Sequence, residues 1–595
     1  MSTASTKSNK QKANRTKAPL ADAQAPLAPA EVVMSDGVWF IAGVAIMLIA
    51  AILRLYDLNL VPLHHDEGVN GNFLVRLVRE GYYHYDPANY HGPTLYYFAA
   101  ALAWILKPFV GSNANLTTFG IRFVPALFGL ATIGLIFTLR RNLGTVATLS
   151  AAFLLAVSPG AVYLSRYFIH ETLFVFFTLG IVVALLKYFE NPRAIHLILA
   201  ALSAALLFAT KETAMISVAV LIIALVVTQV YCAFWRSVGN TPKKKKGGLG
   251  KERDYRTLVE RAGGSSALVL ALVVAVTVFI AAYILFYSSF FTNYPQGVYD
   301  SLKTFKIWTK TGQEAHKHPL ATYIWWLLEQ ESPLLVLAAM GAILAVLKPL
   351  KSFALFSALW AFGLVAAYSL IAYKTPWLAL NFIVPLALTG GVAIEWIYDE
   401  LAKWEISKQL RWCAVAGILL LAIGPLAGMA RIFDEVAYGA TSDSFKGFAS
   451  MDVHWKTFIP GYQTLDLNFL NYDNDNRYYV YVYAHTKRET LRLVDEINRI
   501  AERTHQGSET GITIVSPDYW PLPWYLRDYK RVGYHGQMTP SNEPIIIAKQ
   551  EQAAEVQATF GDRYQQIQSG FNTAGSFPLR PGVDLLLYTR RELVP

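Results

Sequence analysis

Charged residues are scarce in this sequence: Asp, Glu, Lys and Arg make up 16% of its 595 residues, and hydrophobic residues make up 54%. Soluble domains carry about 25% charged residues. Cysteine is nearly absent. Cys232 and Cys413 lie in or at the end of apolar segments, without metal-ligand spacing or a disulfide framework. The composition therefore predicts a polytopic membrane protein and argues against a disulfide-stabilised or cysteine-zinc module.

No cleavable signal sequence is visible. Residues 1–35 are rich in Lys, Ala and Pro and lack an apolar run, so we expect a disordered cytoplasmic tail. Residues 38–56 are long enough to cross a membrane and lack a small-residue cleavage site, which indicates a retained first helix. The net charge of +10 comes from basic clusters beside apolar segments, so it indicates membrane topology and no nucleic-acid partner.

Apolar segments of spanning length recur along residues 36–430. A helix needs about 20 apolar residues to cross the hydrocarbon core of a bilayer. About eleven such helices are predicted, at 38–56, 119–139, 145–163, 170–189, 194–210, 213–234, 265–288, 333–349, 352–372, 377–398 and 412–430. Residues 94–109 are apolar but shorter, and we expect a helix at the membrane interface there.

The basic clusters predict the orientation of the chain, because cytoplasmic loops carry an excess of Lys and Arg. If residues 94–109 do not cross, every cluster falls on the side of the N-terminal tail. The clusters lie at 140–141, 187–193, 243–253, 348–351 and 403–411. We therefore expect a multi-pass plasma-membrane protein with a cytoplasmic N-terminus. The basic loop 235–263 is then cytoplasmic, and loops 57–118 and 290–332 are external.

Residues 431–595 are polar, rich in tyrosine and free of spanning segments. Their hydrophobic pattern predicts one amphipathic helix at 490–503 and strands at 478–483, 511–516, 543–548 and 583–589. Alternation of strands with a helix predicts a small α/β domain. The charge rule places this C-terminal domain outside the membrane.

An adjacent pair of acids, Asp66 and Glu67, follows the first apolar segment in the stretch Leu63-His64-His65-Asp66-Glu67-Gly68. Ionised groups at a membrane boundary cost free energy unless they face water, a partner or a ligand. The pair therefore belongs either to a solvated loop or to a catalytic site at the membrane surface. Neighbouring side chains point in different directions. One of the two can therefore act at the reacting centre while the other holds a metal, an amine or the backbone. We predict Asp66 as the general base, and Glu67 as its catalytic neighbour or as a structural acid.

Further polar residues near the ends of apolar segments share the predicted external side, which indicates one site. Glu171 is predicted as a second acid facing Asp66, and an ion pair between Arg166 and Glu171 is the alternative. Lys211 and Lys374 lie against the positive-inside bias and together favour phosphate binding, although snorkelling explains either one alone. The predicted substrate-binding residues are His65, Tyr90, His91, Arg166, His170, Lys211 and Lys374.

Glu314, His316 and His318 alternate in the external loop, so their side chains share a face if the loop is extended. These residue types are ligands of zinc and manganese. No HExxH motif or cysteine ligand accompanies them, and local hydrogen bonding of the histidines is the alternative. The sequence indicates no cofactor beyond this candidate divalent-metal site.

Several motifs occur in a specific order along the chain. They are Asp66-Glu67, His91-Gly92-Pro93-Thr94-Leu95-Tyr96-Tyr97, Arg122-Phe123-Val124-Pro125-Ala126-Leu127-Phe128-Gly129, Ser165-Arg166 with His170-Glu171, Thr210-Lys211-Glu212, and Tyr373-Lys374-Thr375-Pro376-Trp377. This order resembles the multi-span GT-C glycosyltransferases, which include the protein O-mannosyltransferase and aminoarabinose transferase group. With Pro517-Asp518-Tyr519-Trp520-Pro521-Leu522-Pro523-Trp524-Tyr525, the chain looks most like the flippase-activity-associated protein family of archaea and bacteria, over roughly residues 38–590.

The resemblance implies a GT-C-like α-helical membrane domain that transfers a sugar on the external face. The implied donor is a polyprenyl-phosphate-linked sugar, and the implied acceptor is a lipid or a protein. Carried over by position, Asp66 and Glu67 are the acids of the first loop, Glu171 is the second acid, and Lys211 and Lys374 bind the lipid phosphate. Related transferases often have Asp where this chain has Glu171, whose longer side chain changes its reach.

Three functions stay open at this point. The first is an inverting transferase of the hexosyltransferase type, in which a single base activates the acceptor. The second is a flippase or flippase-associated protein for lipid-linked sugars, to which the family name points. The third is an envelope assembly scaffold without chemistry. The interiors of the spans carry few charges, which favours a surface site over a translocation path.

Overall fold

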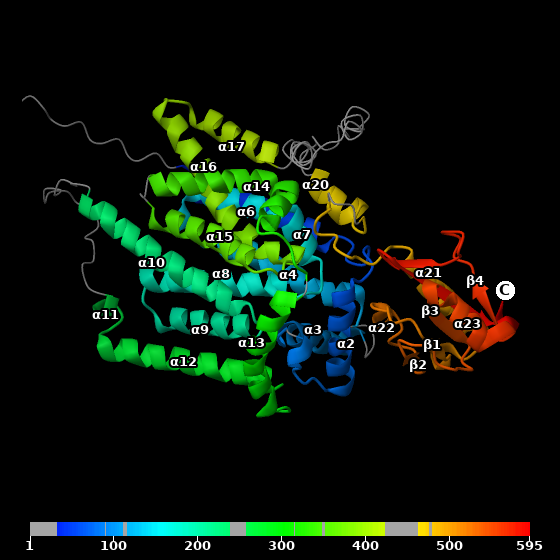
Figure 1. The fold of residues 1–595 in the computed structure, drawn as a ribbon. Coiled ribbons are helices and arrows are strands. Elements are labelled where there is room, and N and C mark those ends of the chain that lie inside the picture. Colours follow the sequence, from blue (N-terminus) through cyan, green and yellow to red (C-terminus); the bar gives the residue numbers. More distant parts are fainter. Residues whose placement is uncertain are drawn as a thin grey trace, which may run out of the picture.

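The computed structural model describes residues 33–89, 91–110, 116–238, 258–314, 316–347, 351–422, 462–474 and 479–594. A bundle of helices makes up most of the molecule, and a smaller domain with a β-sheet lies beyond one end of it (Figure 1). The mostly helical architecture with a small C-terminal sheet domain confirms the predicted fold class.

The bundle is built from the helices before residue 423. They are α1 (Asp36–Leu55), α2 (His65–Glu80), α3 (Thr94–Val110), α4 (Thr118–Phe137), α5 (Arg140–Leu143), α6 (Thr145–Val157), α7 (Pro159–Ser165), α8 (Glu171–Glu190), α9 (Ala194–Phe208), α10 (Ala214–Val238), α11 (Leu258–Arg261), α12 (Ser265–Tyr287), α13 (Gln296–Glu314), α14 (Thr322–Leu347), α15 (Ser352–Leu370), α16 (Leu380–Lys403) and α17 (Lys408–Ala422). Among the described residues, eight helices are long and apolar enough to cross a membrane, or nine if one bent pair is a single span.

The bent pair is α6 and α7, which meet at 61° where a single span was predicted at 145–163. Pro159 cannot continue the hydrogen-bond ladder of α6, so it begins a new helix. Ser158 caps that helix by accepting from the Ala161 N–H at 3.1 Å. The predicted span at 412–430 is described only as far as Ala422, and α9 is shorter than a span, so the count of eleven stays a prediction.

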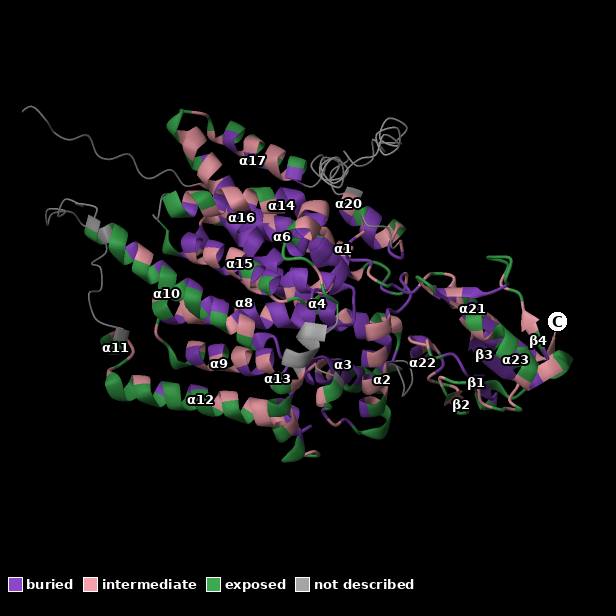
Figure 2. Ribbon diagram, in the orientation of Figure 1, coloured by how far each residue is buried: buried purple, intermediate pink, exposed green. Residues whose placement is uncertain are grey.

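The helices of the bundle differ in how far their residues are buried (Figure 2). Buried residues concentrate in α6 and α16, whereas α10 and α12 present long exposed stretches. The exposed side chains of α12 are large and apolar, including Val269, Leu270, Val273, Val276 and Ile280. Such a surface is favourable against lipid and unfavourable against water.

The first predicted external loop, 57–118, forms two helices rather than one. The interfacial helix predicted at 94–109 corresponds to α3. The other helix, α2, was not predicted, because its N-cap is His64 instead of the usual Ser, Thr, Asp or Asn. His64 and Glu67 form a reciprocal capping box, and Gly81 ends the helix in the left-handed conformation with φ 66°.

Glu67 anchors α2 to the bundle. Its carboxylate is fully buried and accepts from Arg122 of α4, with Nε to Oε1 at 2.7 Å and Nη2 to Oε2 at 2.6 Å. The backbone N–H groups of Phe168 and His64 donate to the same carboxylate at 2.8 and 3.0 Å. Burial raises the pKa of Glu67, but these donors together hold it below its ordinary value. Glu67 therefore has the structural role that the sequence left open, as the partner of Arg122 in a buried ion pair.

The C-terminal domain contains a six-stranded sheet with the order β2-β1-β3-β6-β4, in which β5 pairs with β6. The strands are β1 (Ile512–Ile514), β2 (Val532–Tyr534), β3 (Ile545–Lys549), β4 (Tyr564–Ile567), β5 (Phe577–Arg580) and β6 (Val583–Arg590). The domain's helices are α20 (Tyr462–Leu465), α21 (Thr490–Thr504), α22 (Leu522–Tyr525) and α23 (Ala553–Phe560).

Three of the four predicted strands are confirmed as β1, β3 and β6, and the predicted helix is confirmed as α21. The strand predicted at 478–483 is wrong over its described part, because residues 479–483 contain a turn at Val480 and Tyr481 and no strand. Their alternating aromatic residues pack against the bundle instead: a side chain at Gly160 would collide with the Tyr481 ring at 2.4 Å. Hydrophobic alternation here reflects contact between domains, which local pattern does not distinguish from a sheet.

Two glycines of α2 allow the C-terminal domain to pack directly on this helix. A Cβ atom at Gly68 would lie 2.6 Å from Pro521 Cβ, and one at Gly71 would lie 2.6 Å from the Trp524 ring. Tyr525 also accepts from the Leu63 N–H at 2.8 Å through its hydroxyl. The helix that carries Asp66 is thus held between the bundle and the second domain.

We expect Gly68→Ala to separate the two domains, because the new methyl group also meets Pro521 Cα at 2.9 Å. Overpacking of this kind costs about 1–3 kcal/mol. The midpoint of thermal unfolding should fall, and limited proteolysis should release the C-terminal domain earlier. The control is Gly134→Ala on α4, where nothing lies within 4 Å. Equal stability of the two variants would contradict this packing.

We expect Glu67→Gln to destabilise the protein by about 3–5 kcal/mol, because it leaves the Arg122 guanidinium buried without its counter-charge. The free energy of unfolding should be compared with that of Glu543→Gln, which removes an exposed pair with Arg531 and should cost at most about 1 kcal/mol.

The ion pair between Glu67 and Arg122 also predicts how the stability of the protein depends on pH. Because the folded pKa of Glu67 lies below its unfolded value, the stabilisation is complete above about pH 4.3 and is lost as pH falls further through the folded pKa. The Glu67→Gln variant should lack this contribution. Identical acid-side stability profiles for the two proteins would argue against it.

Candidate active site

The four consecutive residues His64 to Glu67 at the N-terminus of α2 lie in two different environments, one buried and one open to solvent. His64 and Glu67 are buried, whereas His65 and Asp66 are partly exposed. The Asp66 side chain keeps 41% of its surface exposed, so a substrate can reach its carboxylate. Desolvation raises the pKa of Asp66. A carboxylate with a raised pKa is a better general base near neutral pH than an ordinary one.

Four charged or titratable side chains surround Asp66. His65, His91 and Lys211 lower its pKa, and Glu171 raises it, without cancelling the effect of burial. These residues come from the start of α2, the segment before α3, the start of α8 and the turn between α9 and α10. The structure therefore brings together residues that the sequence analysis assigned to one site.

Two of these residues, Lys211 and Glu171, form a buried ion pair with each other, with side chains that are 5% and 3% exposed. Burial lowers the pKa of Lys211, but Glu171 and Glu212 together raise it above its ordinary value, so the ammonium group stays charged. The pair with Lys211 replaces the alternative pair between Glu171 and Arg166. Any phosphate bound by Lys211 must share its charge with Glu171.

Residues 91–94 dock against the turn between α9 and α10. The Gly92 N–H donates to the Thr210 carbonyl at 3.0 Å, and a side chain at Gly92 would collide with the Ala209 carbonyl at 2.0 Å. This close approach places His91 Nδ1 3.3 Å from a carboxylate oxygen of Glu212. The close backbone contact therefore explains the glycine of the His91-Gly92-Pro93 motif, because any side chain at position 92 would collide with the neighbouring turn.

His170 is a buried neutral histidine. Its Nε2–H donates to the Gly92 carbonyl at 2.9 Å, and its Nδ1 has no hydrogen-bond partner among the described residues. Burial lowers the pKa of His170 well below its ordinary value, and His91 and Lys211 lower it further. His170 thus supports the backbone under His91 and does not reach the exposed side of the site.

Lys374 lies in a second cluster with the predicted metal ligands. Residues 316–318 pair with residues 372–374, and Lys374 donates its ammonium group to the carbonyls of Ile371 at 2.6 Å and His318 at 3.4 Å. Burial lowers the pKa of Lys374. His316 Nδ1 lies 2.9 Å from the Tyr483 hydroxyl of the C-terminal domain.

No three His, Cys, Asp or Glu side chains come together as metal ligands in the described part of the chain. The Glu314 side chain and Tyr90 lie outside the described residues. His316 and His318 pack instead on aromatic rings, those of Tyr373 and Trp326. The metal site stays a prediction without a described ligand cluster.

Arg166 does not join the Asp66 group. It donates to the carbonyls of Tyr56 at 2.6 Å and Asp57 at 2.9 Å, just beyond the C-terminus of α1. Its guanidinium carbon lies 4.6 Å from the centroid of the Phe469 ring. Arg166 therefore satisfies carbonyls that the end of α1 leaves free.

Two residues near the site were missed as functional candidates. Tyr373 responds to the charges of Lys211, Asp66 and Glu171, and burial raises its pKa to about 12. Arg580 of the C-terminal domain donates to His65 Nδ1 at 3.1 Å. Tyr373 belongs to the Tyr373-Lys374-Thr375-Pro376-Trp377 motif, so a sequence signal for it was present. No sequence signal indicates Arg580, because its partner lies 515 positions away.

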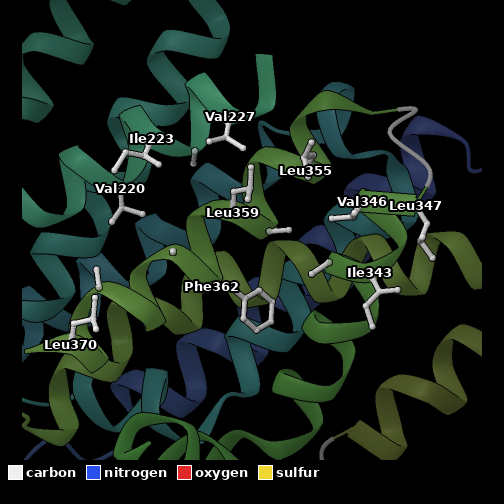
Figure 3. A pocket seen from close by; sticks show the side chains of 15 residues that line it. Val220, Ile223, Val227, Ile343, Val346, Leu347, Leu355, Leu359, Phe362 and Leu370 are labelled. Carbon is white, nitrogen blue, oxygen red and sulfur yellow. The ribbon is translucent and has the colours of Figure 1, made fainter. Parts of the chain in front are cut away.

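A long apolar groove opens between α10, α14 and α15 (Figure 3). Its volume is about 690 Å³, and every labelled side chain along it is a hydrocarbon. Leu370 lines the groove at the end of α15, next to Ile371, whose carbonyl accepts from Lys374. From Leu355 to Leu370 the α15 wall is about 22 Å long. The groove therefore leads towards the Lys374 cluster.

Comparisons with known proteins agree with this architecture. Residues 91–239 match the family model described as dolichyl-phosphate-mannose-protein mannosyltransferase. No curated protein sequence matches the chain. The structure of ArnT from Cupriavidus metallidurans bound to undecaprenyl phosphate is similar with a TM-score of 0.56 and 14% identity, covering 94% of this chain and 100% of that one. The apo state of ArnT gives a TM-score of 0.53 and 15% identity, covering 94% and 99%.

A further similarity is to the oligosaccharyltransferase AglB from Archaeoglobus fulgidus, with a TM-score of 0.47 and 12% identity over 91% of this chain and 74% of that one. The closer resemblance to the flippase-activity-associated family stays a prediction. The family match over residues 91–239, the fold shared with ArnT and the apolar spans together indicate a multi-pass membrane protein with a GT-C-like fold.

Proposed function

We propose that this protein transfers a sugar from a polyprenyl-phosphate-linked donor to a hydroxyl group of a lipid or protein acceptor. The observation that carries the proposal is the position of Asp66, a partly exposed carboxylate among His65, His91, Glu171 and Lys211. A base beside fixed cations suits a reaction in which a hydroxyl loses a proton and a phosphate gains charge.

The groove supports the nature of the donor. A channel lined by hydrocarbon side chains from α10, α14 and α15 suits an isoprenoid chain and offers nothing to a soluble nucleotide. Because it leads to Lys374, a lipid in it would hold its phosphate near that amine. Lys374 now donates to backbone carbonyls, and these contacts would be exchanged for phosphate oxygens.

The proposed reaction is a single displacement at the anomeric carbon. Asp66 accepts the proton of the acceptor hydroxyl, and the acceptor oxygen forms a bond to the anomeric carbon. The bond between that carbon and the phosphate oxygen breaks, and the polyprenyl phosphate leaves with the electron pair. Lys211 and Lys374 stabilise its added negative charge. One displacement inverts the anomeric configuration, so the enzyme is an inverting hexosyltransferase in this proposal.

The basic ends of the helices support an external site. Lys187 donates to the Thr138 carbonyl, and Lys351 donates to the Leu143 carbonyl, so these cations gather at one end of the bundle. Asp66 and the residues around it lie at the opposite helix ends. With the basic end in the cytoplasm, the site and the C-terminal domain face outwards.

We expect Asp66→Asn to lower the rate of sugar transfer at least about 100-fold, because general-base catalysis supplies a factor of this order. Purified protein in liposomes would be given polyprenyl-phosphate sugars labelled in the sugar. Asp562→Asn, which changes a 91% exposed carboxylate on the C-terminal domain, is the matched control. Transfer by folded Asp66→Asn at the wild-type rate would exclude Asp66 as the base. Label that crosses the bilayer without changing carrier would indicate a flippase.

The raised pKa of Asp66 predicts how transfer depends on pH. The base must be deprotonated, so the rate should fall as pH decreases through a midpoint above the ordinary carboxyl value of 3.8. The rate of the chemical step is measured in single-turnover experiments over a range of pH. A midpoint at or below the ordinary value would contradict this environment for Asp66.

We expect Ala367→Trp to weaken binding of a long-chain donor about tenfold or more, because the indole fills the groove beside Leu370. A donor analogue with a very short lipid chain should be affected much less. Ala366→Trp is the control, since Ala366 is exposed on the same helix and does not line the groove. Equal losses for long and short donors would place the lipid elsewhere.

A further inference from the structure

Three charged residues of the C-terminal domain gather at one edge of its sheet. Strand β3 runs parallel to β1, and β5 has the same direction because both β3 and β5 are antiparallel to β6. Asp518 follows β1, Lys549 ends β3 and Arg580 ends β5, so all three lie where strands finish. In open α/β sheets, ligands bind just beyond the carboxyl ends of the strands. In this protein, the carboxyl ends of the strands face α2 of the bundle.

Arg580 connects this edge to the candidate active site. Its Nη1 donates to His65 Nδ1 at 3.1 Å, and its Nη2 donates to Asp518 Oδ1. Lys549 lies 3.3 Å from the other carboxylate oxygen of Asp518. Because the guanidinium group is planar and rigid, two simultaneous contacts determine its orientation. Asp518 therefore holds Arg580 in place, and Arg580 holds the imidazole.

The contact determines which nitrogen of His65 carries the proton. A guanidinium group only donates, so Nδ1 must accept and the hydrogen of the neutral ring must be on Nε2. Burial lowers the pKa of His65, Arg580 and His64 lower it further, and Asp66 and Asp518 oppose this change. The Trp520 ring lies beside the imidazole at an interplanar angle of 57°, with its centroid 6.1 Å from that of His65.

We propose that Arg580 is a positioning residue of the transfer site, which holds His65 as the Nε2–H tautomer beside Asp66 and thereby makes the C-terminal domain part of that site. The proposal rests on the proposed function. In it, His65 donates its Nε2–H to an oxygen of the substrate bound against Asp66. The second domain is then required for turnover even though Asp66 belongs to the bundle.

The first test compares steady-state transfer by Arg580→Ala and by a matched control. We expect kcat to fall about 10- to 100-fold, as is usual when a group that orients a functional imidazole is removed, with a much smaller change in the KM of the donor. Arg580→Lys should recover part of kcat, because an ammonium group can still donate to one partner. The control is Arg531→Ala, which removes an arginine paired with Glu543 on the same domain.

A double variant distinguishes positioning from general destabilisation. If Arg580 acts through His65, then Arg580→Ala should add no further loss to a protein that carries His65→Ala. Losses that multiply, or wild-type kcat in Arg580→Ala, would overturn the proposal. If Arg580→Ala does not fold, Asp518→Asn replaces it, since that change keeps the arginine and removes its anchor. Its expected loss is smaller and equally absent in the His65→Ala background.

A readout without turnover separates this proposal from the proposed function. Diethyl pyrocarbonate modifies neutral imidazole, and mass spectrometry of the peptide with His64 and His65 resolves the modified residue. Because Arg580 lowers the pKa of His65, the midpoint of the pH dependence of modification should move to higher pH in Arg580→Ala and stay unchanged in Arg531→Ala. An unchanged midpoint in Arg580→Ala overturns the contact. A shifted midpoint in a protein without transfer activity supports the contact and contradicts the proposed function.

Discussion

The candidate site depends on one buried interaction, the ion pair between Glu67 and Arg122. Taking both charges out of water is costly, and the pair persists because Glu67 also accepts from two backbone N–H groups while Arg122 donates to the carbonyls of Leu58, Val61 and Pro62. These contacts join α2, α4 and the segment before α8. They establish where α2 begins, and therefore where His65 and Asp66 point.

Around this anchor, polar groups at the same end of the bundle have separate tasks. Buried carboxylates neutralise Arg122 and Lys211, and backbone carbonyls accept hydrogen bonds from Arg166, whereas Asp66 remains partly exposed. In a medium of low dielectric constant, each unpaired charge would be costly, which explains why the buried groups are paired while the Asp66 carboxylate stays open to solvent. The apolar groove and this polar end then supply different parts of the proposed binding energy.

The C-terminal domain contacts the candidate site directly. Gly68 and Gly71 bring Pro521 and Trp524 against α2, and Arg580 extends the contact to His65. A domain that supplies one wall of the site can exclude water from it. The bundle and the sheet domain therefore have to be considered together in any account of specificity.

The sequence by itself determined the class of protein. Apolar length predicted most spans, and the bounds of α3 and α21 follow from local hydrophobic pattern. Adjacent acids after the first span marked Asp66, but the roles of its neighbours required the tertiary structure. Glu67 pairs with a residue 55 positions away and His65 with one 515 positions away. Whether a side chain is buried depends on which helices and strands pack around it. The spacing of residues along the sequence does not show which distant residue folding brings next to it.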